Sequence, residues 1–185
     1  MSTWQLDTAH TVVSFSGKHM MITKVRGLFK GVTGTIAFDE ADPARSRVDV
    51  AIPAGTIETG MEARDNHLRS ADFLDAETHP TLTFVSTGIV ARGNRWAISG
   101  DLAIRGVTRP VVLDAEALGV VTGMDGRRHA GFSATTRIHR SDWGLTWNVG
   151  LEAGGWLVSD EIAVDLEVAA DEVAAVAESA GAIAA

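Results

Sequence analysis

The side chains that could do chemistry gather between Arg64 and His79. Within that segment His67, Asp72 and His79 combine two imidazoles and a carboxylate. Such groups can hold a metal ion or transfer protons, so one hypothesis is a metal-dependent or acid/base enzyme that uses this polar ring. The histidines form neither an H-E-x-x-H motif nor a pair four residues apart, and we therefore assign no metal ligands and no catalytic residues. The other interpretation is a surface connection whose charges are simply solvated.

A second group of interest combines large apolar surface with hydrogen-bonding side chains, between Arg140 and Asn148. Trp143 and Trp147 are four residues apart, with Asp142 beside the first of them. Tryptophan offers a large apolar ring and a single N–H donor. Two interpretations stay open, the rim or floor of a ligand pocket and a hydrogen-bonded corner that plugs a barrel.

A short helix is expected to position the first group. Thr59, followed three residues later by Glu62, is a capping-box pattern, which predicts a helix from about Thr59 to Ser70. The dense charge that follows and Pro80 do not favour continuation of the helix. We therefore expect a short helical insertion around residues 59–75, between strands.

Composition limits the class of protein. The 185 residues include 16 Lys and Arg against 24 Asp and Glu, a net charge of −8. This acidity argues against nucleic-acid binding and against simple electrostatic attachment to an anionic membrane, because both depend on basic residues. The absence of cysteine excludes disulfides and thiolate sites. No apolar run could span a membrane and the start does not resemble a secretion signal, so we expect a cytoplasmic protein without a membrane span.

Apolar and polar residues alternate through most of the chain. This period of two, with one wet face, is typical of antiparallel strands, and about eight or nine such strands predict an all-β fold that is a closed barrel or a sandwich. A barrel of this size is filled by side chains or holds one small ligand. The expected inner face contains no titratable group, which fits either a dry core or a pocket for a hydrophobic molecule. Its residues are Val13, Phe15, Ile36, Phe38, Val48, Val50, Ile52, Leu82, Phe84, Ile98, Leu102, Phe132, Ile138, Ile162, Val164 and Leu166.

Three places interrupt the alternation. Trp4–Asp7 reads as a lead-in before the first strand, and Thr108–Pro110 predicts a break between two strands. From Ala169 onward the chain is rich in alanine and has few apolar anchors. We therefore divide the chain into a barrel domain, residues 1–169, and a tail, residues 170–185, which is a frayed helix or disordered.

Four stretches occur in a characteristic order: V-R-G at 25–27, R-D-N-H-L-R-S-A-D-F-L-D at 64–75, G-D-L-A-I-R-G-V-T-R-P at 100–110 and R-S-D-W-G-L-T-W-N at 140–148. Together they resemble the YceI family of bacterial polyisoprenoid-binding proteins, over roughly Trp4 to Val168. The resemblance implies an extended, antiparallel, lipocalin-like barrel of about eight strands. It also implies an interior that holds an isoprenoid quinone precursor or another long-chain amphiphile, a homodimer, and no established catalysis.

The residues and the resemblance together predict a carrier or reservoir for a hydrophobic small molecule, with no cofactor other than a bound isoprenoid or fatty-acid-like lipid. Four polar residues are candidates for the head group or the rim, namely Arg26, His67, Asp142 and Asn148. The apolar pocket is expected to be lined by Phe15, Ile22, Val25, Phe29, Ile36, Phe38, Val50, Leu68, Phe73, Leu82, Phe84, Ile98, Leu102, Phe132, Ile138, Trp143, Trp147 and Val164.

Overall fold

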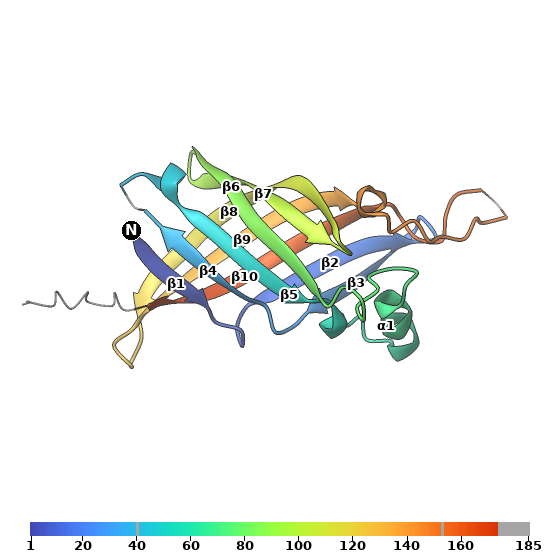
Figure 1. Ribbon diagram of the computed structural model, residues 1–185, viewed down its shortest axis with the longest axis horizontal. Helices are drawn as coiled ribbons and strands as arrows, with labels where there is room; N and C mark the ends of the chain where they lie inside the picture. The colour runs from blue at the N-terminus through green and yellow to red at the C-terminus, as the bar shows by residue number, and fades with distance from the viewer. Residues whose placement is uncertain (40, 153, 174–185) are drawn as a thin grey trace, which may run out of the picture.

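Antiparallel strands make up most of the chain (Figure 1). The computed structural model describes residues 1–39, 41–152 and 154–173. Its helical elements are α1 (Glu62–Arg69) and the short 3-10 turns η1 (Pro43–Arg45), η2 (Ala54–Thr56) and η3 (Arg140–Trp143). Its strands are β1 (Ser2–Leu6), β2 (Val12–His19), β3 (Thr23–Phe29), β4 (Thr33–Phe38), β5 (Arg47–Pro53), β6 (Thr81–Arg92), β7 (Arg95–Ile104), β8 (Val107–Thr122), β9 (Arg128–His139) and β10 (Glu161–Val173).

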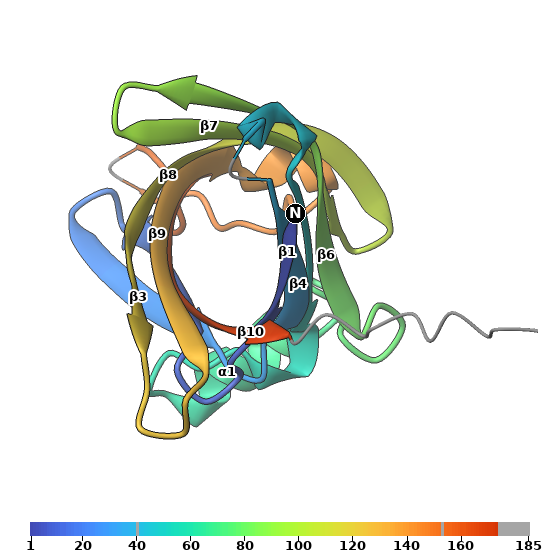
Figure 2. The same cartoon turned by 90° about the vertical axis from the view of Figure 1, so that its left-hand side faces the viewer.

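Most of the strands close into a barrel, which Figure 2 shows end on. The order β1-β4-β5-β6-β7-β8-β9-β10 forms a ring because β1 pairs with β10 as well as with β4. Neighbouring strands in the ring are antiparallel. The predicted all-β, eight-stranded antiparallel barrel with one short helical insertion is therefore confirmed.

The two ends of the barrel differ because two strands share β10. The C-terminal part of β10 pairs with β1, where Ala170 lies opposite Leu6. Its N-terminal part pairs with β2, where Leu166 lies opposite Val13. Consequently β1 and β2 lie end to end along β10. The β2–β3 hairpin extends the wall only at the end of the barrel where α1 lies (Figure 1).

The barrel includes more of both chain ends than the sequence predicts. The expected lead-in at Trp4–Asp7 is wrong, because β1 runs to Leu6 and Trp4 is buried inside the barrel. At the other end β10 continues to Val173, beyond the predicted boundary at 169, because it pairs there with β1. The rest of the predicted tail, residues 174–185, lies outside the described residues.

The break expected at Thr108–Pro110 is also wrong, since these residues lie inside β8. The turn comes just before, at Arg105 and Gly106, whose φ angles are 50° and 74°. Proline lacks the N–H that a ladder hydrogen bond needs. Pro110 is nevertheless tolerated because β9 pairs with β8 only from Asp114 onward, so this part of β8 has a free edge.

The barrel interior is packed with side chains toward the β1 end. Phe38 and Trp96 meet edge to face there, with ring centroids 6.2 Å apart. Deeper in, the ring of Phe84 lies over Gly100, where a Cβ would come within 2.3 Å of the ring. A larger residue than glycine would displace this ring, because interiors are close-packed. This part of the barrel is the dry core that the apolar alternation allowed.

The helical insertion is confirmed, but its predicted capping box is wrong. The N-cap residue of α1 is Met61, and it makes no side-chain capping hydrogen bond. Instead, Thr59 Oγ1 donates to the buried Asp65 Oδ1 at 2.5 Å, and the Thr59 N–H donates to the same oxygen at 2.9 Å. Arg69, the last residue of the helix, donates to two carbonyl oxygens of the preceding segment at 2.8 and 2.7 Å. These bonds hold the insertion across its end of the barrel.

A histidine bound to two carboxylates predicts a pH dependence of stability. His129 on β9 has Nδ1 2.7 Å from Oδ1 of Asp171 on β10, and Nε2 3.3 Å from Oδ1 of Asp125 in the β8–β9 turn. The hydrogen bond to Asp171, and then that to Asp125, raise the pKa of His129 above its ordinary value of 6.5. A histidine with a raised folded-state pKa stabilises the fold fully below its unfolded-state pKa. That stabilisation is lost as the pH rises through the folded-state pKa.

We therefore expect His129→Gln to lower the thermal unfolding midpoint more at about pH 6 than at about pH 9. Unfolding followed by circular dichroism over this range would measure the difference between the two proteins. Asp171→Asn should reduce the same pH dependence, because it removes the strongest partner. A difference between wild type and His129→Gln that is constant with pH would contradict the assignment.

Candidate functional site

An apolar cavity of about 550 Å³ lies inside the barrel at the end that carries α1. This volume falls within the range of about 300–1,000 Å³ typical of small-molecule pockets. Strands from both sides of the barrel form the wall, and α1 and the loop after η3 contribute to the mouth. The apolar lining consists of Val13, Phe15, Val25, Phe29, Ile52, Ile57, Met61, Ala63, Leu68, Phe73, Leu74, Leu82, Leu102, Ile104, Ile138, Leu145, Trp147, Leu157, Val158, Ile162 and Val164.

The cavity brings together many of the residues expected in the pocket. The Phe15 and Phe29 rings, from neighbouring strands, have centroids 5.6 Å apart. They face inward because alternate residues of β2 and β3 point into the barrel. The expected residues that line the cavity are Phe15, Val25, Phe29, Leu68, Phe73, Leu82, Leu102, Ile138, Trp147 and Val164.

The other expected pocket residues lie elsewhere. Ile22 is 81% exposed at the tip of the β2–β3 hairpin, because the strand ends before it and the chain turns outward. The remainder point inward but pack in the filled part of the core or against it. These are Ile36, Phe38, Val50, Phe84, Ile98, Phe132 and Trp143.

The two tryptophans differ in role: one plugs the barrel and the other lines the pocket. Trp143 is buried and its Nε1 donates to the Leu102 carbonyl oxygen at 3.0 Å, so it plugs the barrel. Gly144, with a φ of 74°, then turns the chain. Trp147 lines the cavity, with its ring 4.6 Å from that of His67 and 5.4 Å from that of Phe73.

Of the four polar residues expected at the rim, His67 is the one that lines the cavity. Arg26 is exposed on β3 and alternates with inward-facing neighbours. Asp142 is exposed on η3. Asn148 instead holds the loop after η3, since Nδ2 donates to the Val158 carbonyl oxygen at 2.8 Å and Oδ1 accepts the Val158 N–H at 3.0 Å.

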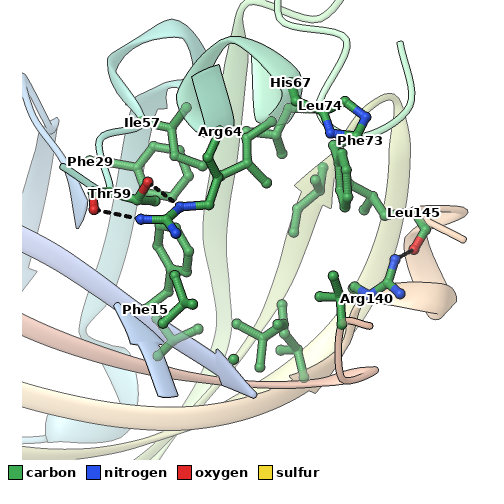
Figure 3. A pocket seen from close by; sticks show the side chains of 18 of the residues that line it. Phe15, Phe29, Ile57, Thr59, Arg64, His67, Phe73, Leu74, Arg140 and Leu145 are labelled. Carbon is green, nitrogen blue, oxygen red and sulfur yellow. Dashed lines mark hydrogen bonds between the residues drawn. The ribbon is translucent and has the colours of Figure 1, made fainter. Parts of the chain in front are cut away.

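Arg64 on α1 lines the cavity, although it is not among the residues that the sequence predicts at the pocket or its rim (Figure 3). Its Nε donates to Thr59 Oγ1 at 2.6 Å and its Nη2 to the Thr59 carbonyl oxygen at 2.9 Å. Among the described residues Nη1 has no hydrogen-bond acceptor. The helical period would have located this residue, because Leu68, expected in the pocket, lies four residues later on the same helix face.

Arg140 is the second unexpected cation of the lining, and it is only 8% exposed. Its Nε donates to the Ser159 carbonyl oxygen at 3.0 Å, and its Nη1 donates to those of Leu145 and Trp147 at 2.5 and 2.9 Å. Burial lowers the pKa of Arg140, and the charge of Asp160 opposes that shift. The guanidinium remains protonated because its ordinary pKa is so high. It fixes the loop that borders the mouth.

The titratable groups of the lining are all basic, although the chain as a whole is acidic. They are Lys18, His19, Arg64, His67 and Arg140, and none of the described residues that line the cavity is acidic. The expected inner face of the strands contains no titratable group, but the end of β2, the helix α1 and the turn η3 add these basic side chains to the lining. Such a mouth suits a head group that accepts hydrogen bonds.

The polar ring considered for catalysis is only partly assembled. His67 Nε2 lies 2.8 Å from Asp72 Oδ2. His79 lies instead against the β7–β8 turn, where a Cβ on Gly106 would come within 3.0 Å of its Cε1. Within the described ranges, no group of three or more histidines and carboxylates could hold a metal ion. The helices in the same ranges are too short or too polar to cross a membrane.

Comparison with known proteins agrees with this fold. Residues 4–170 match the family described as the YceI-like domain. Protein YceI of Escherichia coli O157:H7 is 38% identical over 141 residues, which cover 76% of this chain and 74% of that protein. The YceI protein of Campylobacter jejuni has a TM-score of 0.71 at 36% identity, over 84% of this chain and 90% of that one. A polyisoprenoid binding domain from Saccharophagus degradans shares the fold, with a TM-score of 0.66 at 16% identity over 94% and 100% of the two chains. The chain therefore belongs to the YceI family, as its sequence motifs predicted.

Proposed function

We propose that the protein binds one long-chain isoprenoid or similar amphiphilic lipid, with the hydrocarbon chain inside the barrel cavity. The observation that carries this proposal is a cavity of about 550 Å³ whose lining is mostly apolar, with basic groups at the mouth. The polyisoprenoid binding domain of Saccharophagus degradans, which shares the fold, supports the same class of ligand. The role that follows is that of a carrier or reservoir, without catalysis.

Burial of hydrocarbon would supply the affinity. Each buried methylene group contributes about 0.8 kcal/mol. Association costs about 4–15 kcal/mol, so a few isoprene units of five carbons each are enough to offset it. Affinity should therefore increase with chain length, up to the length that the cavity accommodates.

The basic groups at the mouth would orient the ligand. Arg64 has a donor, Nη1, without an acceptor among the described residues, and His67 lies on the same helix. A head group with acceptor oxygens, such as a hydroxyl, quinone, carboxylate or phosphate, would be placed beside these donors. The hydrocarbon chain would then run toward the inner wall, where Val164 and Leu102 lie.

Two further proposals have less direct support. A homodimer follows from the family resemblance, and sedimentation of the purified protein would test it. A metal-dependent or acid/base enzyme at His67 and Asp72 is the second candidate function, favoured by their 2.8 Å contact. Stoichiometric metal that is lost in His67→Ala would favour the enzyme over the lipid carrier.

The first test is native mass spectrometry of protein purified without detergent, followed by solvent extraction of what it carries. We expect a single long-chain species at about one per chain, because the apolar cavity of about 550 Å³ has the size of a site for one ligand. Empty protein that also fails to take up an added polyprenyl alcohol would contradict the proposal.

Blocking the mouth should slow loading. Ala63 lies in the first turn of α1 and lines the cavity while remaining exposed. An indole ring at this position would obstruct entry, so Ala63→Trp should slow uptake of a polyprenyl alcohol by about tenfold or more. Asn66→Trp, on the same helix but outside the lining, is the matched control and should load at the wild-type rate. Equal uptake by both variants would place the entrance elsewhere.

A further inference from the structure

The tip of the β2–β3 hairpin exposes three large apolar side chains beside the cavity mouth. Met20, Met21 and Ile22 are 45%, 50% and 81% exposed. The residues just before them, Lys18 and His19, line the cavity. The tip therefore borders the mouth, at the end of the barrel opposite β1 (Figure 1).

The backbone of this tip is unfavourable for the residues that occupy it. Met20 and Met21 have φ angles of 51° and 63°, and the Ile22 N–H donates to the His19 carbonyl oxygen at 3.1 Å. A two-residue turn with positive φ at both positions strongly favours Asn-Gly. Most other residues, methionine included, are strained in this conformation. The turn geometry does not explain the two methionines at these positions. We therefore look for a role of their exposed apolar side chains in binding.

A second segment holds the tip in place and enlarges its apolar surface. The Met20 N–H donates to the Leu157 carbonyl oxygen at 2.8 Å, and a Cβ on Gly155 would lie 3.4 Å from Met21 Cγ. Trp156, between them, is 57% exposed. We call Met20, Met21, Ile22 and Trp156 the tip patch.

Positive charge lies directly behind the tip patch. Lys18, Lys24 and Arg26 are exposed on one face of the hairpin, with Lys18 directly opposite Lys24. Residues 12–29 include no aspartate or glutamate. The ion pairs among the described residues do not involve these three cations. Like charges in directly opposed positions destabilise a strand pair, so the hairpin is suited to an external anionic partner.

Two carboxylates lie on the adjacent loop, and one of them is already engaged. Asp160 Oδ1 and Oδ2 accept hydrogen bonds from Ser141 at 3.0 and 2.8 Å, and His139 lies 3.4 Å away. Glu152 is exposed, in the part of the loop that precedes Trp156. The hairpin itself thus remains a basic surface on an acidic protein.

We propose that the tip patch docks the cavity mouth onto an anionic lipid bilayer. The apolar side chains would enter the interfacial region, with Trp156 at head-group level, while Lys18, Lys24 and Arg26 contact lipid phosphates. The overall charge of −8 disfavours membrane attachment, but the hairpin presents its three cations locally. If the proposed lipid-binding function holds, docking lets a long-chain ligand pass between bilayer and cavity without crossing water.

Vesicle flotation tests this proposal with the full chain. We expect the protein to float with vesicles of phosphatidylcholine containing about 30% phosphatidylglycerol, and much less with phosphatidylcholine alone. Replacing Met20→Asn together with Met21→Gly suits the turn, so the fold is kept while vesicle affinity falls about tenfold or more. Lys18→Gln with Lys24→Gln should lower the affinity about 30-fold, since each cation near an anionic surface contributes roughly fivefold.

Met124→Asp is the matched control. Met124 is fully exposed in the β8–β9 turn, at the opposite end of the barrel from the tip patch, so this variant should float as the wild type does. Wild-type protein that does not float, or a Met20→Asn/Met21→Gly variant that floats equally well, would overturn the proposal. A third outcome would also overturn it: the wild type does not bind vesicles, and the Met20→Asn/Met21→Gly variant sediments as a monomer where the wild type sediments as a dimer. The tip patch would then contact a second copy of the chain. Flotation needs no cavity ligand, so its failure leaves the proposed lipid binding untouched.

Discussion

Replacing Val164→Asp is expected to abolish lipid loading while leaving the barrel folded. Val164 lies on β10, half-buried, and lines the apolar wall of the cavity. Hydrocarbon that filled the cavity would strip water from the new carboxylate, and an unpaired buried charge costs at least several kcal/mol. Bound lipid should therefore fall by about 100-fold or more, as measured by native mass spectrometry and solvent extraction.

The control for this prediction is a substitution of similar size at the same position. Val164→Thr keeps the size and shape of the side chain and replaces one methyl group with an uncharged hydroxyl, so it should retain most of the lipid. Asp165, the next residue, already carries a charge on the outer face of the same strand. A folded Val164→Asp protein with unchanged lipid content would show that the hydrocarbon lies elsewhere. Charges at Phe84 or Phe132, which the strand pattern alone would equally select, fall in the packed part of the barrel and would threaten folding instead.

The strands themselves could be predicted because their alternation is local. β10, for example, shows an aliphatic face opposite a mostly acidic one. A period of two reports which face a residue is on but not how far along the barrel it lies. Phe15 and Phe38 both point inward, yet one lines the cavity and the other packs against Trp96. That difference depends on β1 and β2 sharing β10, a long-range pairing that no local pattern specifies.

The site was harder to predict than the fold because loops and the helix supply its polar groups. The side-chain direction of Arg140 depends on three carbonyl oxygens that lie up to 19 residues away in sequence. Asp142 and Asn148 belong to the same motif, but neither faces the cavity. Asp142 is exposed to solvent, and Asn148 bonds to Val158 within the loop. His67 and His79 lie in one polar segment, yet the chain carries His79 away to the β7–β8 turn.

Arg140→Met should cause the largest loss of stability among single polar substitutions at the mouth. The substitution keeps an unbranched side chain but removes donors to the carbonyl oxygens of Ser159, Leu145 and Trp147. An unsatisfied buried acceptor costs about 1–3 kcal/mol, and partial access to water at the mouth reduces the total. We therefore expect the free energy of unfolding to fall by about 3 kcal/mol in urea denaturation.

Arg140→Lys separates the charge from the geometry of these bonds. An ammonium keeps the positive charge but is a compact point donor, which does not reproduce the planar fork that spans two segments of the chain. Its stability should therefore lie between those of wild type and Arg140→Met. A loss below about 0.5 kcal/mol in Arg140→Met would show that the carbonyls find other donors, such as water. The loop that Arg140 holds also carries Trp147 and Trp156, so a variant weakened at Arg140 should lose a defined cavity mouth. Its lipid uptake should therefore fall at temperatures well below its unfolding midpoint.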